Sequence, residues 1–302
     1  MTKSALLALL ALSAASVPSF AQIDLSGSWF PYNESDALSN SPGPRPLPLD
    51  FLGIPFNKYG QERGLLYSPS YMSVPERICA GYPPHYLVVG PHGVKIWNEM
   101  EPLTGTTVAW HINGWEDRAP TTIWMDERPH PSENAPHPPG GFVTGKWEGD
   151  VLVAYTTHME AGLVRRSGAF LSDQATMTAR FFRHGDTLTV TARIDDPYYL
   201  TEPYYLTRLF KQDSVASIHA VPPPCVQGDE GVPEGAVPHY MPGNNQFIGE
   251  LTRKYHIPEE AYMGGAETMY PEFRKKIKDK YTIPDKCPND CGGPGKFGLR
   301  NQ

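Results

Sequence analysis

Apolar and polar residues alternate through much of the middle of the chain, which is the period-two pattern of half-buried β-strands. From residue 85 onward these runs recur about every 8 to 14 residues, with glycine, proline or aspartate between many of them. Many short strands joined by turns are typical of an antiparallel sandwich or barrel. The predicted strands are His85–Val89, Val94–Asn98, Thr106–Asn113, Thr121–Met125, Phe142–Trp147, Val151–His158, Ala175–Arg183, Thr187–Asp195 and Tyr204–Lys211.

One hairpin in this series has the clearest pattern. Gly185 and Asp186 suit the two central positions of a type II′ turn between two alternating strands. The resulting register places apolar residues opposite one another on one face, and a one-residue slip would mix the faces. On the polar face Arg180 and Arg193 lie diagonally across the ladder, within reach of one anionic group. This face either meets solvent, as is usual in antiparallel sheets, or lines the inside of a barrel, and only the second arrangement makes a site.

The alternating pattern is limited to the centre of the chain. Before it come a strand-like stretch, Ile23–Trp29, and a proline-rich run that favours extended backbone lying on a surface. After about residue 213 the pattern stops, and two helix-like stretches follow, Asn245–Tyr255 and Ala266–Lys280. We expect a mainly β protein with a single calycin-like antiparallel β-barrel, similar to the allene-oxide-cyclase and dirigent type. The expected segments are a signal peptide at 1–21, an extended N-terminal arm at 22–84, the barrel core at 85–212 and a C-terminal extension with short helices at 213–302.

The first 21 residues have the three parts of an export signal. Lys3 supplies the positive end, Leu6–Ala15 the apolar stretch, and cleavage is expected after Ala21. No later stretch reaches the roughly 18 apolar residues of a membrane-spanning helix. Removing the signal takes away one lysine and no acid, so the net charge changes from −7 to about −8, which speaks against nucleic acid and anionic membranes as partners. We expect a periplasmic or secreted protein without stable membrane insertion.

All four cysteines, Cys79, Cys225, Cys287 and Cys291, follow the expected cleavage point. An even number in an oxidising compartment favours two disulfides, for which three pairings are possible. Zinc binding is the weaker interpretation, because three residues separate Cys287 from Cys291 and no second close pair follows.

Ten strings along the chain resemble a family of exported bacterial proteins of unassigned function. The resemblance extends over most of the chain after the signal, with differences at Glu127, where glycine is usual, and at Ala179, where glutamate is usual. The second difference removes a carboxylate from the hairpin and weakens an acid–base role there. The resemblance supports the fold and the candidate residues, but implies no activity. The strings are Asp24–Trp29 (DLSGSW), Met125–Pro131 (MDERPHP), Gly145–Val153 (GKWEGDVLV), Thr156–His158, Arg165–Gly168, Ser172–Thr176, Asp195–Pro197, Tyr199–Pro203, Val237–Gly243 and Gly264–Pro271 (GGAETMYP).

His158 is the leading catalytic candidate, because histidine titrates near neutral pH and acts as a general base or acid when a carboxylate orients it. Glu160 or Asp173 is the expected carboxylate, and Arg165 or Arg166 would hold a substrate carboxylate or enolate through charge-assisted bonds. The alternative is a strand-end histidine bonded to the backbone. The predicted catalytic residues are His158, Arg166 and Asp173, and the predicted substrate-binding residues are Tyr155, Arg165, Arg180, Arg193, Trp110 and His130.

Other chemistries lack their sequence motifs. The chain has no phosphate-cradling loop, no dinucleotide fingerprint and no Gly-x-Ser-x-Gly elbow. No His-x-His or His-x₃-His pair occurs in a predicted strand or helix, so we expect no metal and no cofactor. His130 and His137 lie in a proline-rich loop, residues 129–141, which is a candidate lid over a barrel mouth.

Three hypotheses for the function follow. The first is an exported barrel that acts on a small organic molecule in its lumen, as a cofactor-independent lyase or isomerase in which His158 transfers a proton. The second is a periplasmic carrier of a hydrophobic or aromatic ligand, lined by Trp110, Trp115, Tyr155 and Phe182. The third is a structural envelope protein, which a barrel filled with packed side chains and no cavity would favour.

Overall fold

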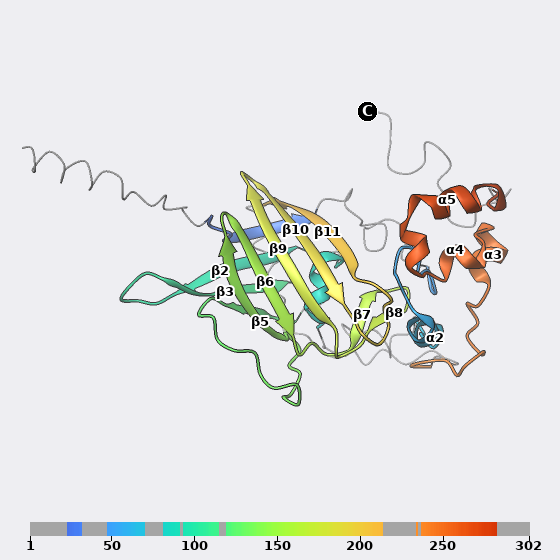
Figure 1. Cartoon of the computed structure of the whole chain (residues 1–302), viewed down its shortest axis with the longest axis horizontal. Coiled ribbons are helices and arrows are strands. Elements are labelled where there is room, and N and C mark those ends of the chain that lie inside the picture. The colour runs from blue at the N-terminus through green and yellow to red at the C-terminus, as the bar shows by residue number, and fades with distance from the viewer. Residues whose placement is uncertain are drawn as a thin grey trace, which may run out of the picture.

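The computed structural model describes residues 23–31, 47–69, 81–90, 93–114, 119–213, 234 and 237–282. In this part of the chain, nine strands form a closed barrel in the order β1-β11-β10-β9-β6-β5-β4-β3-β2 (Figure 1). The prediction of a mainly β protein with one barrel and a short helical C-terminal extension is confirmed. The barrel strands are β1 (Gly27–Pro31), β2 (Val94–Met100), β3 (Thr107–Gly114), β4 (Thr121–Trp124), β5 (Phe142–Glu148), β6 (Val151–Thr157), β9 (Thr176–His184), β10 (Thr187–Asp195) and β11 (Tyr204–Gln212).

Two pairings differ from the expected barrel. β1 comes from the expected arm, yet it pairs with both β11 and β2 and so closes the barrel. β4 and β5 run parallel, with Ile123 opposite Val143. Parallel neighbours need a long connection, and residues 125–141 provide one that carries the chain back to the same end of the sheet.

The hairpin of β9 and β10 has the predicted register. Phe181 lies opposite Val190, and Gly185 has a positive φ of 60°, as the turn requires. The apolar row of both strands is buried inside the barrel, whereas Arg180 and Arg193 lie on the outer face and are exposed. Of the two arrangements that the sequence left open, the threonine and arginine face therefore meets solvent and does not line the lumen. Burying the apolar row removes far more apolar surface from water than burying the threonine and arginine face would. Burying the two arginines would also remove the water that hydrates their charges, which costs free energy.

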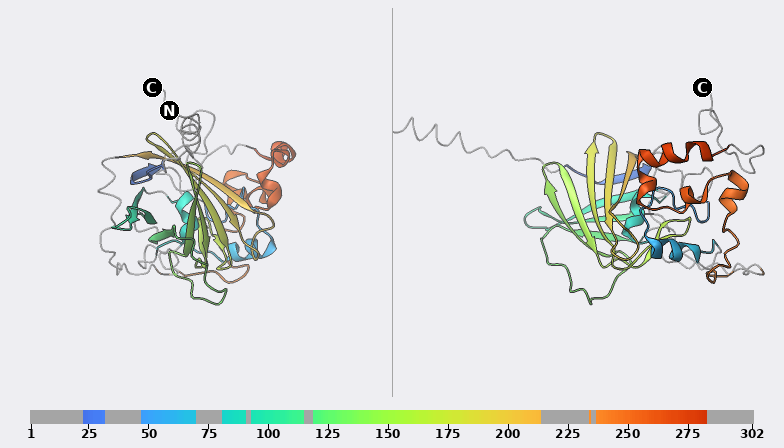
Figure 2. Two further views of the ribbon diagram at one scale, coloured as in Figure 1. Left: turned by 60° about the vertical axis from the view of Figure 1, so that its left-hand side comes forward. Right: turned by 45° about the vertical axis from the view of Figure 1, so that its right-hand side comes forward.

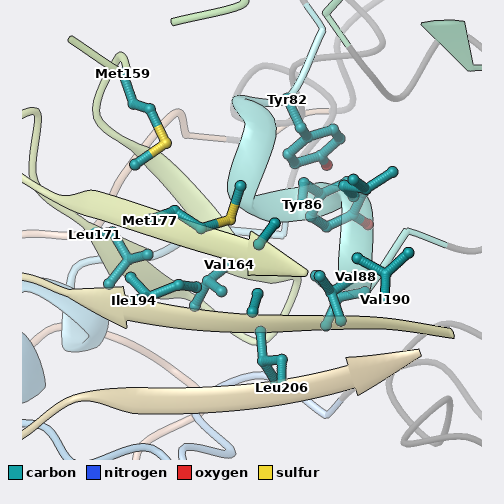
Figure 3. Close-up of a cluster of buried hydrophobic side chains, with 14 of the residues drawn as sticks. Tyr82, Tyr86, Val88, Met159, Val164, Leu171, Met177, Val190, Ile194 and Leu206 are labelled. Carbon is teal, nitrogen blue, oxygen red and sulfur yellow. The ribbon is translucent and has the colours of Figure 1, made fainter. Parts of the chain in front are cut away.

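The inside of the barrel is filled with packed side chains. A 3₁₀ helix, η4 (Pro84–Val88), forms where a strand was predicted, and all five of its residues are buried. Tyr86 stacks on Tyr82 with ring centroids 3.9 Å apart, and Figure 3 shows both rings among buried side chains that include Met177, Val190 and Leu206. A cavity between side chains inside the described part of the barrel has a volume of about 20 Å³, which is room for about one water molecule.

The other elements gather at one end of the barrel, as Figures 1 and 2 show. They include a helix from the expected arm, a two-stranded hairpin that the sequence did not predict, and short helices in place of the two longer ones expected in the extension. They are α2 (Lys58–Leu65), β7 (Gly162–Arg165), β8 (Ala169–Leu171), α3 (Glu250–Tyr255), α4 (Glu259–Tyr262), η6 (Ala266–Met269), α5 (Pro271–Ile277) and η7 (Lys278–Lys280).

Asp196 joins this end to the barrel wall. It follows β10 directly, and its buried carboxylate accepts hydrogen bonds from Ser172, at 2.7 Å from the backbone nitrogen and 2.8 Å from the hydroxyl. It also accepts bonds from the backbone N–H groups of Tyr198 and Tyr199, at 2.9 and 3.2 Å. One carboxylate thus fixes both the turn between β10 and β11 and the segment that follows β8.

Several sequence predictions concern residues outside the described part of the chain. These are the signal peptide at 1–21, the four cysteines and Trp115. Among the described helices, none is long and apolar enough to cross a membrane.

Candidate functional site

The predicted site residues do not meet inside the barrel. Trp110 is buried on the inner face, with its ring centroid 6.3 Å from that of Trp147. Tyr155 lies on the outer face of β6 and is 43% exposed, as is Phe182 on β9 at 38%. A ligand lining made of Trp110, Tyr155 and Phe182 is therefore wrong, because strand alternation puts these side chains on opposite sides of the wall.

Three of the predicted residues, His158, His130 and Tyr155, do come together on the outer face of β5 and β6. The loop of residues 125–141 covers this face. His130 lies with its ring centroid 5.1 Å from that of Tyr155, and its two ring nitrogens lie 2.7 Å from the Thr157 hydroxyl and 2.8 Å from the Thr144 hydroxyl. His158 contacts the same Thr157 hydroxyl through Nδ1 at 2.7 Å, so one hydroxyl connects the two histidines.

These contacts form a series of hydrogen bonds, and the donor and acceptor in each one follow from the bond between His158 and a backbone carbonyl. His158 Nε2 lies 2.9 Å from the carbonyl oxygen of Ser132, which can only accept, so Nε2 carries the hydrogen. In the neutral ring Nδ1 then accepts from the Thr157 hydroxyl, and that oxygen in turn accepts from Nδ1–H of His130. His130 Nε2 is left to accept from the Thr144 hydroxyl. Every ring nitrogen of both histidines is used when both rings are neutral.

This arrangement holds the loop rather than exposing a base. His158 has a left-handed backbone with φ of 54° and bonds to the loop backbone, and His137 Nδ1 lies 2.9 Å from the carbonyl oxygen of Met159. Burial, and then the charge on His158, lower the pKa of His130. The contacts agree with the alternative interpretation of His158, a strand-end histidine bonded to the backbone. The loop covers the outer wall of the barrel instead of a barrel mouth.

Replacing Thr157 with valine tests this chain of hydrogen bonds. The substitution keeps the branched shape but removes both bonds, so we expect the free energy of unfolding to fall by about 1.5 kcal/mol. Urea unfolding measures this loss, and the ¹⁵N shift of His158 Nδ1 reports the lost donor. Thr191→Val, on the outer face of β10, is the matched control, with an expected change within about 0.5 kcal/mol. Equal losses in the two variants would contradict the proposed chain.

The other predicted catalytic residues lie away from His158. Asp173 is exposed, and its side chain lies 3.3 Å from the amide nitrogen of Gln174. The Arg166 guanidinium lies over the Tyr82 and Tyr86 rings, 5.6 and 6.0 Å from their centroids. The structure therefore does not assemble His158, Arg166 and Asp173 into one group.

Arg165, which was expected to bind substrate beside His158, instead contacts residues 50–52. Its guanidinium donates to the carbonyl oxygen of Leu52 at 3.2 Å and lies near Asp50. Burial raises the pKa of the Asp50 carboxyl, and the charge of Arg165 partly offsets this rise. Arg165 thus connects the β7–β8 hairpin to residues 50–52, which precede α2.

A larger cavity lies outside the barrel, between α2, β8 and the C-terminal extension. We call it the α2–β8 cavity. Its volume is about 390 Å³, it is partly open to solvent, and it is lined by Arg63, Leu66, Tyr67, Phe170, Pro238 and His239. Sequence reasoning named none of these residues as site residues, because α2 lies in what reads as an extended arm and β8 is only three residues long.

The walls of this cavity are fixed by specific contacts. Asn57 caps the start of α2, and its side chain accepts a hydrogen bond from the backbone N–H of Gly60 at 3.0 Å. At the other end of the helix, buried Asn245 donates to the carbonyl oxygens of Leu65 and Tyr67, at 2.8 and 3.1 Å. Carbonyls at a helix end need such partners, so Asn245 ties the extension to α2.

Arg63 is the charged group of the α2–β8 cavity. Its guanidinium lies over the Phe170 ring, 3.8 Å from the centroid, and Phe170 in turn meets Tyr67 edge to face at 6.2 Å. Within the described residues, the structure gives this guanidinium no hydrogen bond and no carboxylate within 4.0 Å. Burial lowers the pKa of Arg63, which is half-buried, but an arginine stays protonated at neutral pH.

The described residues contain no group of three or more histidine, cysteine, aspartate or glutamate side chains placed to hold a metal ion. No protein-family model, no curated protein and no solved structure matches the chain.

Proposed function

We propose that this protein binds a small organic molecule in the α2–β8 cavity, as a carrier or binding protein outside the cytoplasm. The observation that supports this most is the volume of about 390 Å³ beside aromatic side chains and one cation. Ligand cavities of about 300–1,000 Å³ with mostly apolar walls and a few polar groups are the usual small-molecule sites. The cavity described inside the barrel, at about 20 Å³, is too small for such a molecule.

Export is part of the proposal and rests on residues 1–21 alone, with their positive end, apolar stretch and small residues before Gln22. The net negative charge of the chain makes nucleic acid an unfavourable partner. A ligand-binding role also explains why the extension is tied to α2 through Asn245, because the cavity exists only when both elements are in place.

One observation favours a second candidate, a cofactor-independent lyase or isomerase. His239 lines the same cavity as Arg63. A histidine base beside an arginine that stabilises negative charge is the pair that proton abstraction next to a carboxylate requires. In this candidate His239 and Arg63 take the roles first expected of His158 and Arg166.

Filling the cavity tests the proposed function. We expect native mass spectrometry of the protein from its own host to show a retained small molecule, and Leu66→Trp to lose it, because the larger ring occupies the cavity. Thr191→Trp, on the outer face of β10, is the matched control and should keep the ligand. Equal retention in both folded variants would contradict a ligand in this cavity. Turnover of the retained molecule that His239→Ala abolishes would select the enzyme over the carrier.

A further inference from the structure

The charge of Arg63 indicates which chemical class of ligand suits the α2–β8 cavity, and this inference rests on the proposed function. Arg63 reaches the cavity from the last turn of α2, where a cation is favourable because the helix end is partly negative. The guanidinium carbon of Arg63 lies 3.8 Å from the Phe170 ring centroid, so the ring covers one side of this planar group. The N–H groups point outward from the edges of that plane, so they stay available to a ligand.

Among the described residues that line the cavity, no acid balances this charge. The six lining residues include no aspartate or glutamate, and the nearby Glu62 pairs with Lys58 at 3.6 Å on the exposed side of α2. A half-buried cation without a carboxylate partner is costly, and an anionic ligand would remove that cost. A guanidinium fork matches a carboxylate with two parallel hydrogen bonds, which a point charge such as an ammonium group cannot do.

The other lining residues indicate the shape and polarity of the part of the ligand that does not contact Arg63. The cavity wall is made of rings and aliphatic surface from Phe170, Tyr67, Leu66 and Pro238. The Arg63 guanidinium already lies over the Phe170 ring. Such walls favour a flat, apolar group over a sugar or a peptide backbone, which would need several polar partners. The volume of about 390 Å³ lies in the lower part of the usual range, so the group is one or two rings in size.

We propose that the α2–β8 cavity binds an aromatic carboxylate, with the carboxylate on Arg63 and the ring against Phe170 and Tyr67. The carboxylate would lie in the plane of the guanidinium edge and the ring would occupy the apolar part of the cavity. Binding of this kind weakens as salt screens the exposed part of the ion pair. It also discriminates strongly against a neutral amide of the same shape, because only the carboxylate forms the charged pair.

Calorimetric titration of the full chain with 2-naphthoate, and with 2-naphthamide as its neutral counterpart, tests this proposal. We expect 2-naphthoate to bind at least tenfold more tightly than the amide. Arg63→Gln should weaken 2-naphthoate at least tenfold and leave the amide unchanged, and Arg63→Lys should weaken it by an intermediate factor. Arg180→Gln, a surface arginine on β9, is the matched control and should bind like the wild type.

The outcomes separate the ligand class from the proposed function. Equal binding of acid and amide, unchanged in Arg63→Gln but lost in Leu66→Trp, would overturn the carboxylate while leaving a ligand site in the cavity. Binding of neither probe, together with no retained molecule in native mass spectrometry, would overturn both. Thermal unfolding of each variant shows whether a loss of binding comes from the cavity or from the fold.

Discussion

Replacing Asp196 with alanine is expected to lower the free energy of unfolding by about 4 kcal/mol, enough to unfold a marginal domain. The substitution leaves three backbone N–H groups and the Ser172 hydroxyl without their acceptor. Asp196 is only 4% exposed, so water cannot easily replace the carboxylate. Hydrogen bonds to a charged group contribute about 1.5–3 kcal/mol each, and stranded buried donors add their own cost.

The neighbouring acid gives a matched control for this prediction. Asp195 accepts from Arg193 at 2.9 Å, and both side chains are more than 40% exposed, so Asp195→Ala should cost less than about 1 kcal/mol. Asp196→Asn keeps one acceptor oxygen and should fall between the two alanine variants. Urea unfolding followed by circular dichroism measures all three, and a similar loss in both alanine variants would show that Asp196 is not the anchor.

The strands were predictable because local residue order determines them. Eight of the nine predicted strands exist, and the β9–β10 register follows from Gly185 and the alternation on either side of it. The predicted strand His85–Val89 is wrong, because a short apolar run between prolines is equally compatible with a buried strand and with a helical turn. The direction of β4 and β5 failed for another reason, since a long loop allows either pairing.

The candidate sites depend on contacts between distant residues, which the sequence pattern does not encode. His130 and His158 meet through one hydroxyl of Thr157, and nothing in the spacing of the two histidines indicates it. Arg63 and Phe170 lie more than a hundred positions apart and meet only because α2 packs on β8. Whether the threonine and arginine face points inward or outward depends on how the barrel closes, and the alternation of residues within one hairpin does not determine that closure.

His85 is expected to make the protein less stable in mild acid. Its side chain is fully buried and lies with Nε2 3.1 Å from the carbonyl oxygen of Leu163 in β7. Burial lowers its pKa from 6.5 to about 4, although this hydrogen bond and the charge of Asp196 favour the protonated form. Between these two pH values the unfolded chain binds a proton at His85 and the folded protein does not.

The free energy of unfolding should therefore fall as the pH drops from about 6.5 to 4, and the part due to His85 is about 3 kcal/mol. His85→Gln keeps an N–H donor for Leu163 but cannot take up a proton, so its stability should change by about 3 kcal/mol less than that of the wild type over this range. Urea unfolding at pH 7, 5.5 and 4 measures the difference. His184→Gln, at an exposed position that ends β9, is the matched control and should follow the wild-type profile. Parallel profiles for wild type and His85→Gln would mean that His85 is reached by water in the folded protein, and that η4 does not seal the barrel interior beside β7.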